Sequence, residues 1–251
     1  MKLENTNETP LYLKALIYGP FGIGKTMLAG TACDVEAMRG VLLVRAEDGA
    51  LTIKNNAVRA TPLIDTIKLA DEVYFGLAQR SPEFAGIKTV VFDSISAMLQ
   101  TVLREVVDTN CRKNSNKDPN LPSQHDYGQM TFIMRRMIRR FAALPMNVIF
   151  TALLRERFNT DDEAEKMKRG PVLCMPDLTP KVAEDAMAAV DMVWALNAKA
   201  DGTRVLLTQR SGAWVAKTRG EEFAKALAPK LENPTLPIIH KLLTETQGKQ
   251  V

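Results

Sequence analysis

Residues 19–26 read G-P-F-G-I-G-K-T and match the pattern G-x-x-x-x-G-K-T. Loops of this pattern hold the phosphates of a nucleotide in backbone N–H groups, here those of residues 22–26, at the start of a helix. Lys25 is expected to reach the β- and γ-phosphates and Thr26 to ligate Mg²⁺. The predicted nucleotide-binding residues are Gly19, Gly22, Ile23, Gly24, Lys25, Thr26 and Met27.

Carboxylates follow two apolar stretches of the chain. Asp93 ends T-V-V-F-D, and Glu47 and Asp48 follow V-L-L-V-R-A. A hydrolase with a phosphate loop needs one carboxylate to orient Mg²⁺ and another to activate the attacking water. We therefore predict that Thr26 and Asp93 bind the metal and that the acidic turn supplies the second carboxylate. Two alternatives stay open: Asp93 as the N-cap of a helix, and a merely solvated acidic turn.

The neighbours of Asp93 narrow the class of protein. No glutamate follows Asp93 directly, unlike many ATP-driven motors. A D-x-x-G sequence does not follow it either, and the chain has no N-K-x-D sequence for guanine. The last two absences argue against a GTPase.

Strands that alternate with helices must position these residues. The apolar runs predict strands at 12–18, 41–46, 88–93 and 146–154, and the spacing predicts helices at 25–40, 62–80, 94–109, 127–144 and 180–189. Later strands at 191–197, 203–209 and 213–218 are joined by tight turns, and two short helices follow from 220. We therefore predict an α/β fold: a mostly parallel sheet flanked by helices, with antiparallel strands at one edge. Long loops are expected at 111–126 and 155–180.

Length, charge and cysteine content limit the number of domains and the kinds of partner and metal site that we expect. The 251 residues suit one large domain with short additions, and we expect a flexible head at 1–11, a core at 12–220 and a helical appendage at 221–251. A net charge of +4 permits a nucleic-acid partner without requiring one. Three scattered cysteines suggest neither disulfides nor zinc. We expect no signal peptide and no membrane span, and hence a cytoplasmic protein.

Taken in this order, the phosphate loop, the acidic turn, Asp93-Ser94 and the strand N-V-I-F-T resemble the RecA-like ATPases over roughly residues 12–220. The resemblance implies a RecA-like P-loop NTPase core with ATP and Mg²⁺ as cofactors. It implies that Glu47 is the general base. Thr151 is the candidate for the polar γ-phosphate sensor, although the family often has Gln or His near this place.

The stretch A-K-T-R-G adds a further match. Members of this superfamily carry a K-x-R or K-x-K pair that reaches the γ-phosphate bound by the adjacent subunit, and Lys217 and Arg219 occupy that place. The resemblance therefore implies a homo-oligomer, ring or filament, with active sites between subunits. The implied catalytic residues are Lys25, Glu47, Lys217 and Arg219. Taken alone, K-T-R is also compatible with a solvated strand end.

The order and size of these parts look most like the compact RecA-like ATP-binding proteins of bacteriophages, some of which act in recombination and single-strand annealing. The resemblance implies an ATPase that self-assembles, acts on single-stranded DNA and is stimulated by it, in the host cytoplasm. Two other hypotheses are a ring helicase motor or loader of the DnaB-like class and a P-loop small-molecule kinase.

Basic residues in the two predicted loops and on one helix are the candidates for nucleic-acid contact. The helix M-R-R-M-I-R-R-F carries four arginines that we expect on one face, opposite buried Met134, Met137, Ile138 and Phe141. Phe158 is the one aromatic residue of the second loop that is available for stacking. The candidates are Arg112, Lys113, Arg135, Arg136, Arg139, Arg140, Arg155, Arg157, Lys168 and Arg169.

Overall fold

Five parallel strands form the centre of the sheet. The computed structural model describes residues 12–47, 53 and 55–247 of the chain. The central strands are largely apolar and buried, apart from the exposed end of β5, and stand in the order β7-β1-β5-β4-β2. Their bounds are β1 (Lys14–Gly19), β2 (Val41–Arg45), β4 (Thr89–Asp93), β5 (Asn147–Arg157) and β7 (Met192–Ala198).

The edge strands complete the predicted arrangement. β3 (Val58–Ala60) extends the parallel sheet beside β2. On the other side, β8 (Arg204–Leu207) and β9 (Lys217–Thr218) pair antiparallel with β7, and β10 (Lys230–Glu232) pairs antiparallel with β8. The fold class predicted from the sequence is confirmed.

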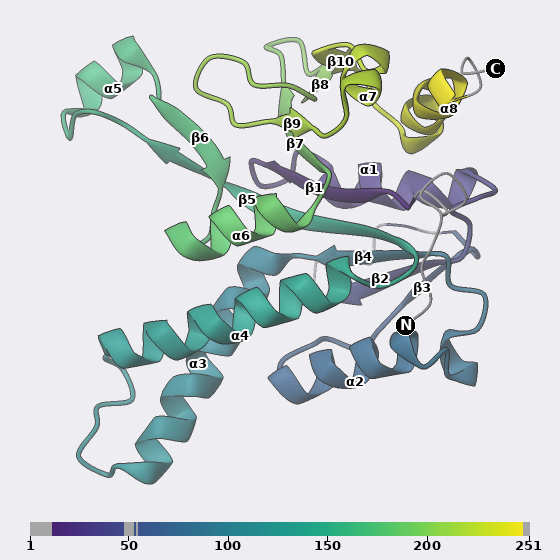
Figure 1. Ribbon diagram of the computed structural model, residues 1–251. Coiled ribbons are helices and arrows are strands. Elements are labelled where there is room, and N and C mark those ends of the chain that lie inside the picture. Colours follow the sequence, from purple (N-terminus) through teal and green to yellow (C-terminus); the bar gives the residue numbers. More distant parts are fainter. Residues whose placement is uncertain (1–11, 48–52, 54, 248–251) are drawn as a thin grey trace.

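Helices cover both faces of the sheet (Figure 1). On one face α2, α3, α4 and α6 pack around Phe92 and Phe150, and on the other α1, α7 and α8 pack around Ile17 and Trp194. The bounds are α1 (Lys25–Gly30), α2 (Ile67–Ala78), α3 (Ile95–Lys113), α4 (Gln124–Ala142), α6 (Pro180–Ala189), α7 (Glu221–Ala226) and α8 (Leu236–Gln247).

Polar side chains fix where the helices begin. Ser94 caps α3 by accepting the N–H of Ala97 at 3.2 Å. Ser123 and Asp126 form a capping box at the start of α4. Thr66 caps α2, so the helix expected from residue 62 begins at Ile67.

The helix after the phosphate loop is shorter than predicted. The expected helix at 25–40 ends at Gly30 and continues only as a 3₁₀ turn over Thr31–Asp34. The hydroxyl of Thr31 donates to the carbonyl of Leu28 at 2.6 Å, and this local bond competes with a further helical turn.

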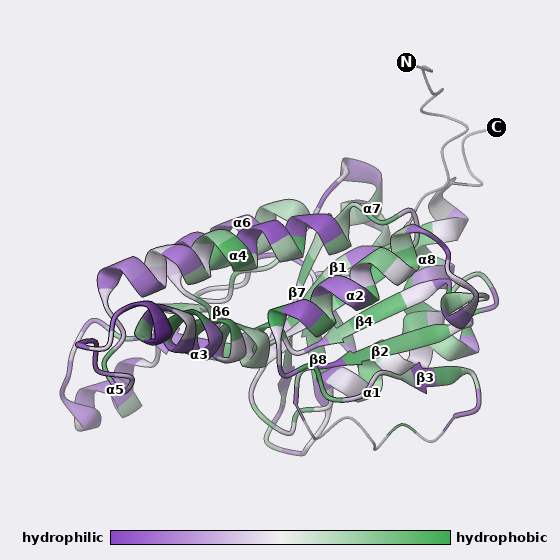
Figure 2. Cartoon of the chain, turned by 90° about the horizontal axis from the view of Figure 1, so that it is seen from below, coloured by the Kyte–Doolittle hydropathy of each residue, from purple (hydrophilic) through white to green (hydrophobic). Residues whose placement is uncertain are grey.

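Both predicted loops are more ordered than expected. Residues 111–113 and 124–126 belong to α3 and α4, so the connection is 114–123. In the second segment β5 continues to Arg157 and pairs with β6 (Leu173–Pro176), and α5 (Glu163–Arg169) lies between the two strands. The α3–α4 hairpin and this β5–β6 arm project on the same side of the molecule (Figures 1 and 2).

The C-terminal part is not purely helical, because β10 lies between α7 and α8 and adds a strand to the sheet. Leu236, Ile239 and Leu243 of α8 are buried against the sheet. The strand expected at 213–218 is reduced to Lys217–Thr218, because Ser211 and Trp214 form a tight turn before it. No helix in the described ranges is long and apolar enough to cross a membrane.

Candidate nucleotide-binding site

The glycine-rich loop follows β1 directly and leads into α1. Gly22 and Gly24 have φ angles of 72° and 97°, which favour glycine. Gly19 packs so closely on β7 that a Cβ there would lie 2.1 Å from the carbonyl oxygen of Leu196. No side chain caps the start of α1, so its first N–H groups are open to an anion.

Lys25 lies inside the loop. Its side chain is 8% exposed, and Nζ donates to the carbonyls of Gly19 at 3.0 Å and Pro20 at 2.8 Å. Burial lowers the pKa of Lys25, and the charges of Asp93 and Glu47 oppose that shift. Two carbonyls hold the ammonium group of Lys25 beside two carboxylates. Its positive charge would attract the phosphates of an incoming nucleotide.

Asp93 is buried at the carboxyl end of β4 and is bonded to a helix and to another strand. Thr26 Oγ1 donates to Asp93 Oδ2 at 2.8 Å, and Thr151 of β5 donates to Asp93 Oδ1. The hydroxyl of Thr26 and the carboxylate of Asp93 are thus adjacent, and oxygens of this kind are the ligands that Mg²⁺ prefers. These residues fit a nucleotide with its magnesium ion. Ser94 caps α3, so Asp93 is not its N-cap.

Glu47 follows β2 and faces the same site. Burial raises the pKa of Glu47, and the charge of Asp93 raises it further. A hydrogen bond with the side chain of Ser94 and the charge of Lys25 act in the opposite direction. Asp48, the other half of the acidic turn, lies outside the described residues.

Arg204 of β8 is a neighbour of the loop that the sequence did not indicate. A Cβ on Gly24 would lie 2.8 Å from the Cζ atom of Arg204. The guanidinium is therefore packed over the loop. Only the pairing of β8 with β7 brings this residue there, since it is 180 positions away in the chain.

Lys217 and Arg219 lie at the opposite edge of the sheet. β9 pairs with the first residues of β7, which stand beside the start of β1 and not its end. Arg219 Nη1 is 2.7 Å from Asp191 Oδ1, and its Nη2 donates to the carbonyl of Ala188 at 3.1 Å. Burial lowers the pKa of Lys217, and the charge of Arg219 adds to this effect. The structure therefore does not bring these cations to the phosphate loop of their own chain.

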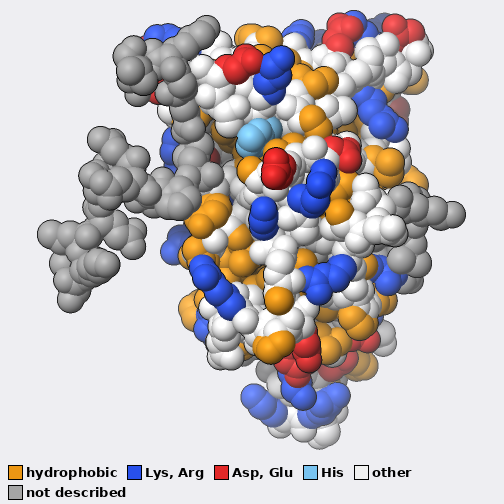
Figure 3. All heavy atoms as spheres, turned by 90° about the vertical axis from the view of Figure 1, so that its right-hand side faces the viewer, with side chains coloured by type: hydrophobic (Ala, Val, Ile, Leu, Met, Phe, Trp, Pro, Cys, Tyr) orange, Lys and Arg blue, Asp and Glu red, His pale blue; other side chains and the backbone are white. Residues whose placement is uncertain are grey.

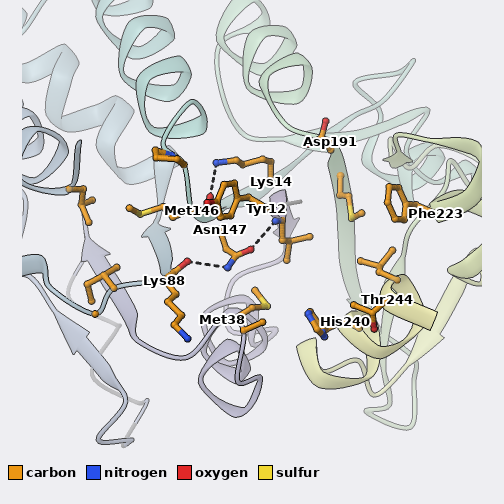
Figure 4. A pocket seen from close by; sticks show the side chains of 18 of the residues that line it. Tyr12, Lys14, Met38, Lys88, Met146, Asn147, Asp191, Phe223, His240 and Thr244 are labelled. Atoms are coloured by element: carbon orange, nitrogen blue, oxygen red, sulfur yellow. Dashed lines mark hydrogen bonds between the residues drawn. The ribbon is translucent and has the colours of Figure 1, made fainter. Parts of the chain in front are cut away.

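A cavity of about 840 Å³ opens at this same amino edge of the sheet and is separate from the phosphate loop. Hydrophobic side chains gather there among lysines and arginines (Figure 3). Figure 4 shows Lys14, Asn147, Asp191 and His240 around it. Burial lowers the pKa of Lys14 to about 8 against the charge of Asp191, and its Nζ donates to the carbonyl of Met146 at 2.6 Å.

The predicted arginine face of α4 is divided. The four apolar residues expected opposite it are buried, as predicted. Arg135 and Arg139, however, pair with Asp185 of α6, the latter at 3.0 Å. Arg140 pairs with Asp71 of α2 at 3.3 Å. Adjacent helix positions differ by about 100° in direction, so the four arginines turn towards different neighbours. Of the four arginines, Arg136 alone has no ion pair with another described residue.

The other basic candidates lie on the two projections. Arg112 and Lys113 are exposed in the last turn of α3. Arg155 and Arg157 are exposed at the end of β5, and Lys168 and Arg169 are exposed on α5. The ring of Phe158, the stacking candidate, is already covered by the ammonium of Lys166 at 5.8 Å from its centroid.

Comparison with known proteins gives one family. Residues 11–220 match a family model described as an AAA domain, and this range contains the loop, Glu47, Asp93 and the K-T-R stretch. No curated protein matches the chain. Among solved structures, the crystal structure of the RadB recombinase is similar, with a TM-score of 0.42 and 16% sequence identity, covering 82% of this chain and 86% of that chain.

Proposed function

This chain belongs to the AAA domain family of P-loop ATPases, and from that premise we propose that it hydrolyses ATP with Mg²⁺, self-assembles and acts on single-stranded DNA in phage-type recombination or annealing. The observation that carries the ATPase part is the meeting of four side chains at the carboxyl edge of the sheet. They are Lys25, Thr26, Asp93 and Glu47, from α1, β4 and the end of β2.

Each of these side chains has a role that its surroundings support. The N–H groups of residues 22–26 and the ammonium of Lys25 bind the phosphates. Thr26 and Asp93 would hold Mg²⁺, which offsets charge on the phosphate oxygens. Thr151 was the sensor candidate, but its hydroxyl is buried on Asp93. We therefore assign Thr151 to positioning Asp93.

Glu47 is the proposed acceptor of the proton from the attacking water. In the nucleotide-free chain, burial and the charge of Asp93 raise the pKa of Glu47, which makes it a stronger base than a solvated carboxylate. The hydrogen bond with Ser94 orients the carboxylate towards the site.

Lys217 and Arg219 are proposed to act on the nucleotide of a neighbouring subunit. Met192 of β7 lies opposite Ala15, four residues before the end of β1, which is roughly 13 Å along the strand. That distance keeps both cations away from the phosphate loop of their own chain, so we assign them to the nucleotide of another chain. Cations placed on transferring phosphoryl groups in this way raise hydrolysis rates by orders of magnitude.

The DNA part rests on the two basic projections and is tested through the ATPase. We expect single-stranded DNA to stimulate ATP hydrolysis by the wild-type chain and Lys25→Ala to abolish it. ATPase rates measured with and without an oligonucleotide distinguish a DNA-dependent ATPase from a small-molecule kinase. A rate that DNA does not change, with phosphate transferred to a small acceptor, would favour a kinase. Undiminished activity of the Lys25→Ala protein would remove the ATPase assignment itself.

A further inference from the structure

The solvent-facing side of α4 carries aromatic side chains that the described chain leaves open. Phe132 is 66% exposed and Tyr127 is 44% exposed, whereas Met130 and Met134 on the opposite side are buried. The hydrophobic and polar sides of this helix can be followed in Figure 2. Single exposed apolar residues are common on protein surfaces, so the ring of Phe132 alone does not indicate a site.

Gly128 lies one helical turn before Phe132, in the interior of α4. Glycine destabilises a helix interior relative to alanine. Its φ is not positive, and a Cβ there would meet no described atom within 4 Å, so the fold itself does not require glycine. Because Gly128 has no side chain, the surface of α4 is flat at this position. Two shallow hollows of about 630 and 350 Å³ lie on either side of it, and both reach the ring of Phe132. A group from outside the chain can therefore approach the helix backbone closely beside an aromatic ring.

Positive charge surrounds this place. Arg136 is exposed one turn beyond Phe132, and Lys181 of α6 lines the smaller hollow with Arg135. Asp185 pairs with both Arg135 and Arg139 and offsets one of their two positive charges. Within the described ranges Arg136 and Lys181 have no ion pair, so they remain available for an anionic partner.

We propose that Gly128, Phe132, Arg136 and Lys181 form a binding site for single-stranded DNA, in which a base lies against Gly128 and stacks on Phe132. The inference rests on the proposed function. An exposed ring offers a surface on which any base can stack, and flanking cations bind the phosphates on either side of it. Lysine is depleted in protein–protein interfaces, so Lys181 beside the ring favours DNA over a second protein.

Four variants of the full chain test the site by fluorescence anisotropy with an oligothymidine. Phe132→Ala should weaken binding by about 5- to 150-fold, the range for one lost base stack, while the salt dependence stays unchanged. Arg136→Ala should instead reduce the slope of log affinity against log salt by about one. Gly128→Leu should place a side chain between the two hollows and weaken DNA binding. It should not lower Tm, since leucine is a better helix former than glycine. Ile238→Ala on α8, another exposed apolar residue, is the control and should bind like wild type.

The outcomes separate this site from the function it depends on. If the wild-type chain does not bind the oligonucleotide, the proposed function and the site both fail. If it binds, but Phe132→Ala and Gly128→Leu bind equally well, only the site is overturned. If Phe132→Ala keeps its DNA affinity and loses self-assembly, measured by light scattering, the face belongs to a second copy of the chain and the site is again overturned.

Discussion

At the scale of single residues, the site is a cluster of one buried cation and two carboxylates that depend on one another. The charges of Asp93 and Glu47 oppose the lowered pKa of Lys25, and the charge of Asp93 adds to the effect of burial on Glu47. In the nucleotide-free chain the carboxylate form of Glu47 is therefore disfavoured relative to a solvated glutamate.

Glu47→Gln should separate stability from activity. A pKa raised on folding adds stability at low pH that is lost as the pH rises through the folded pKa, so at neutral pH the carboxylate destabilises the fold. We expect the Gln variant to have a higher Tm than wild type at neutral pH, with a difference that shrinks as the pH falls through the folded pKa and is gone below the pKa of unfolded Glu. ATP hydrolysis should drop by about 10²- to 10⁴-fold through loss of the general base. Thermal unfolding across pH and ATPase rates check both parts, and a lower Tm at neutral pH would contradict the account.

The sequence predicted this cluster because each member has a local signature. Lys25 and Thr26 belong to a contiguous motif, and Asp93 and Glu47 end apolar strands. Arg204 and the contact of Thr151 with Asp93 have no such signature, because they depend on the pairing of β1 with β7 and of β4 with β5, strands that are distant in the chain. A single sequence with an ordinary arginine or threonine does not reveal these contacts.

At the scale of elements, α4 shows what helical periodicity does and does not predict. The apolar spacing identified Met134, Met137, Ile138 and Phe141 as buried. The partners of the arginines depend on where α2 and α6 pack, and the periodicity of one helix contains no information on its neighbours. The same limit applies to β10, whose three residues become a strand only because β8 is beside them.

Arg140 and Arg136 should therefore behave differently when they are replaced. Arg140 pairs with Asp71 and lies 5.5 Å from the ring centroid of Tyr74, whereas Arg136 projects into solvent. Arg140→Ala should lower the free energy of unfolding by about 1 kcal/mol, which corresponds to a fall in Tm of about 2–4 °C for a chain of this size. Arg136→Ala should change stability by less than about 0.5 kcal/mol. Differential scanning calorimetry checks this, and equal losses for the two variants would show that the α2–α4 contact does not stabilise the fold.

At the scale of the whole molecule, the two sets of proposed catalytic residues stand at opposite edges of one sheet. Lys25 and Glu47 lie at the carboxyl ends of the strands, and Lys217 and Arg219 lie beside their amino ends. A molecule with half a site at each end completes a site only by head-to-tail association, which gives a ring if it closes and a filament if it does not. Under the proposed arrangement, ATP hydrolysis therefore depends on assembly.

Mixing two inactive variants tests whether ATP hydrolysis depends on a cation from the neighbouring subunit. Lys25→Ala removes the phosphate-binding cation, and Lys217→Ala removes the proposed trans cation while keeping the ion pair of Arg219 with Asp191. In a random equal mixture, about a quarter of the junctions would join an intact loop to an intact Lys217, so about a quarter of the wild-type ATPase rate should return. The Ile238→Ala protein, mixed with Lys25→Ala, is the control for dilution alone. If the mixture forms mixed assemblies by light scattering and stays inactive, Lys217 does not act across the subunit boundary, and the two ends of the sheet need separate explanations.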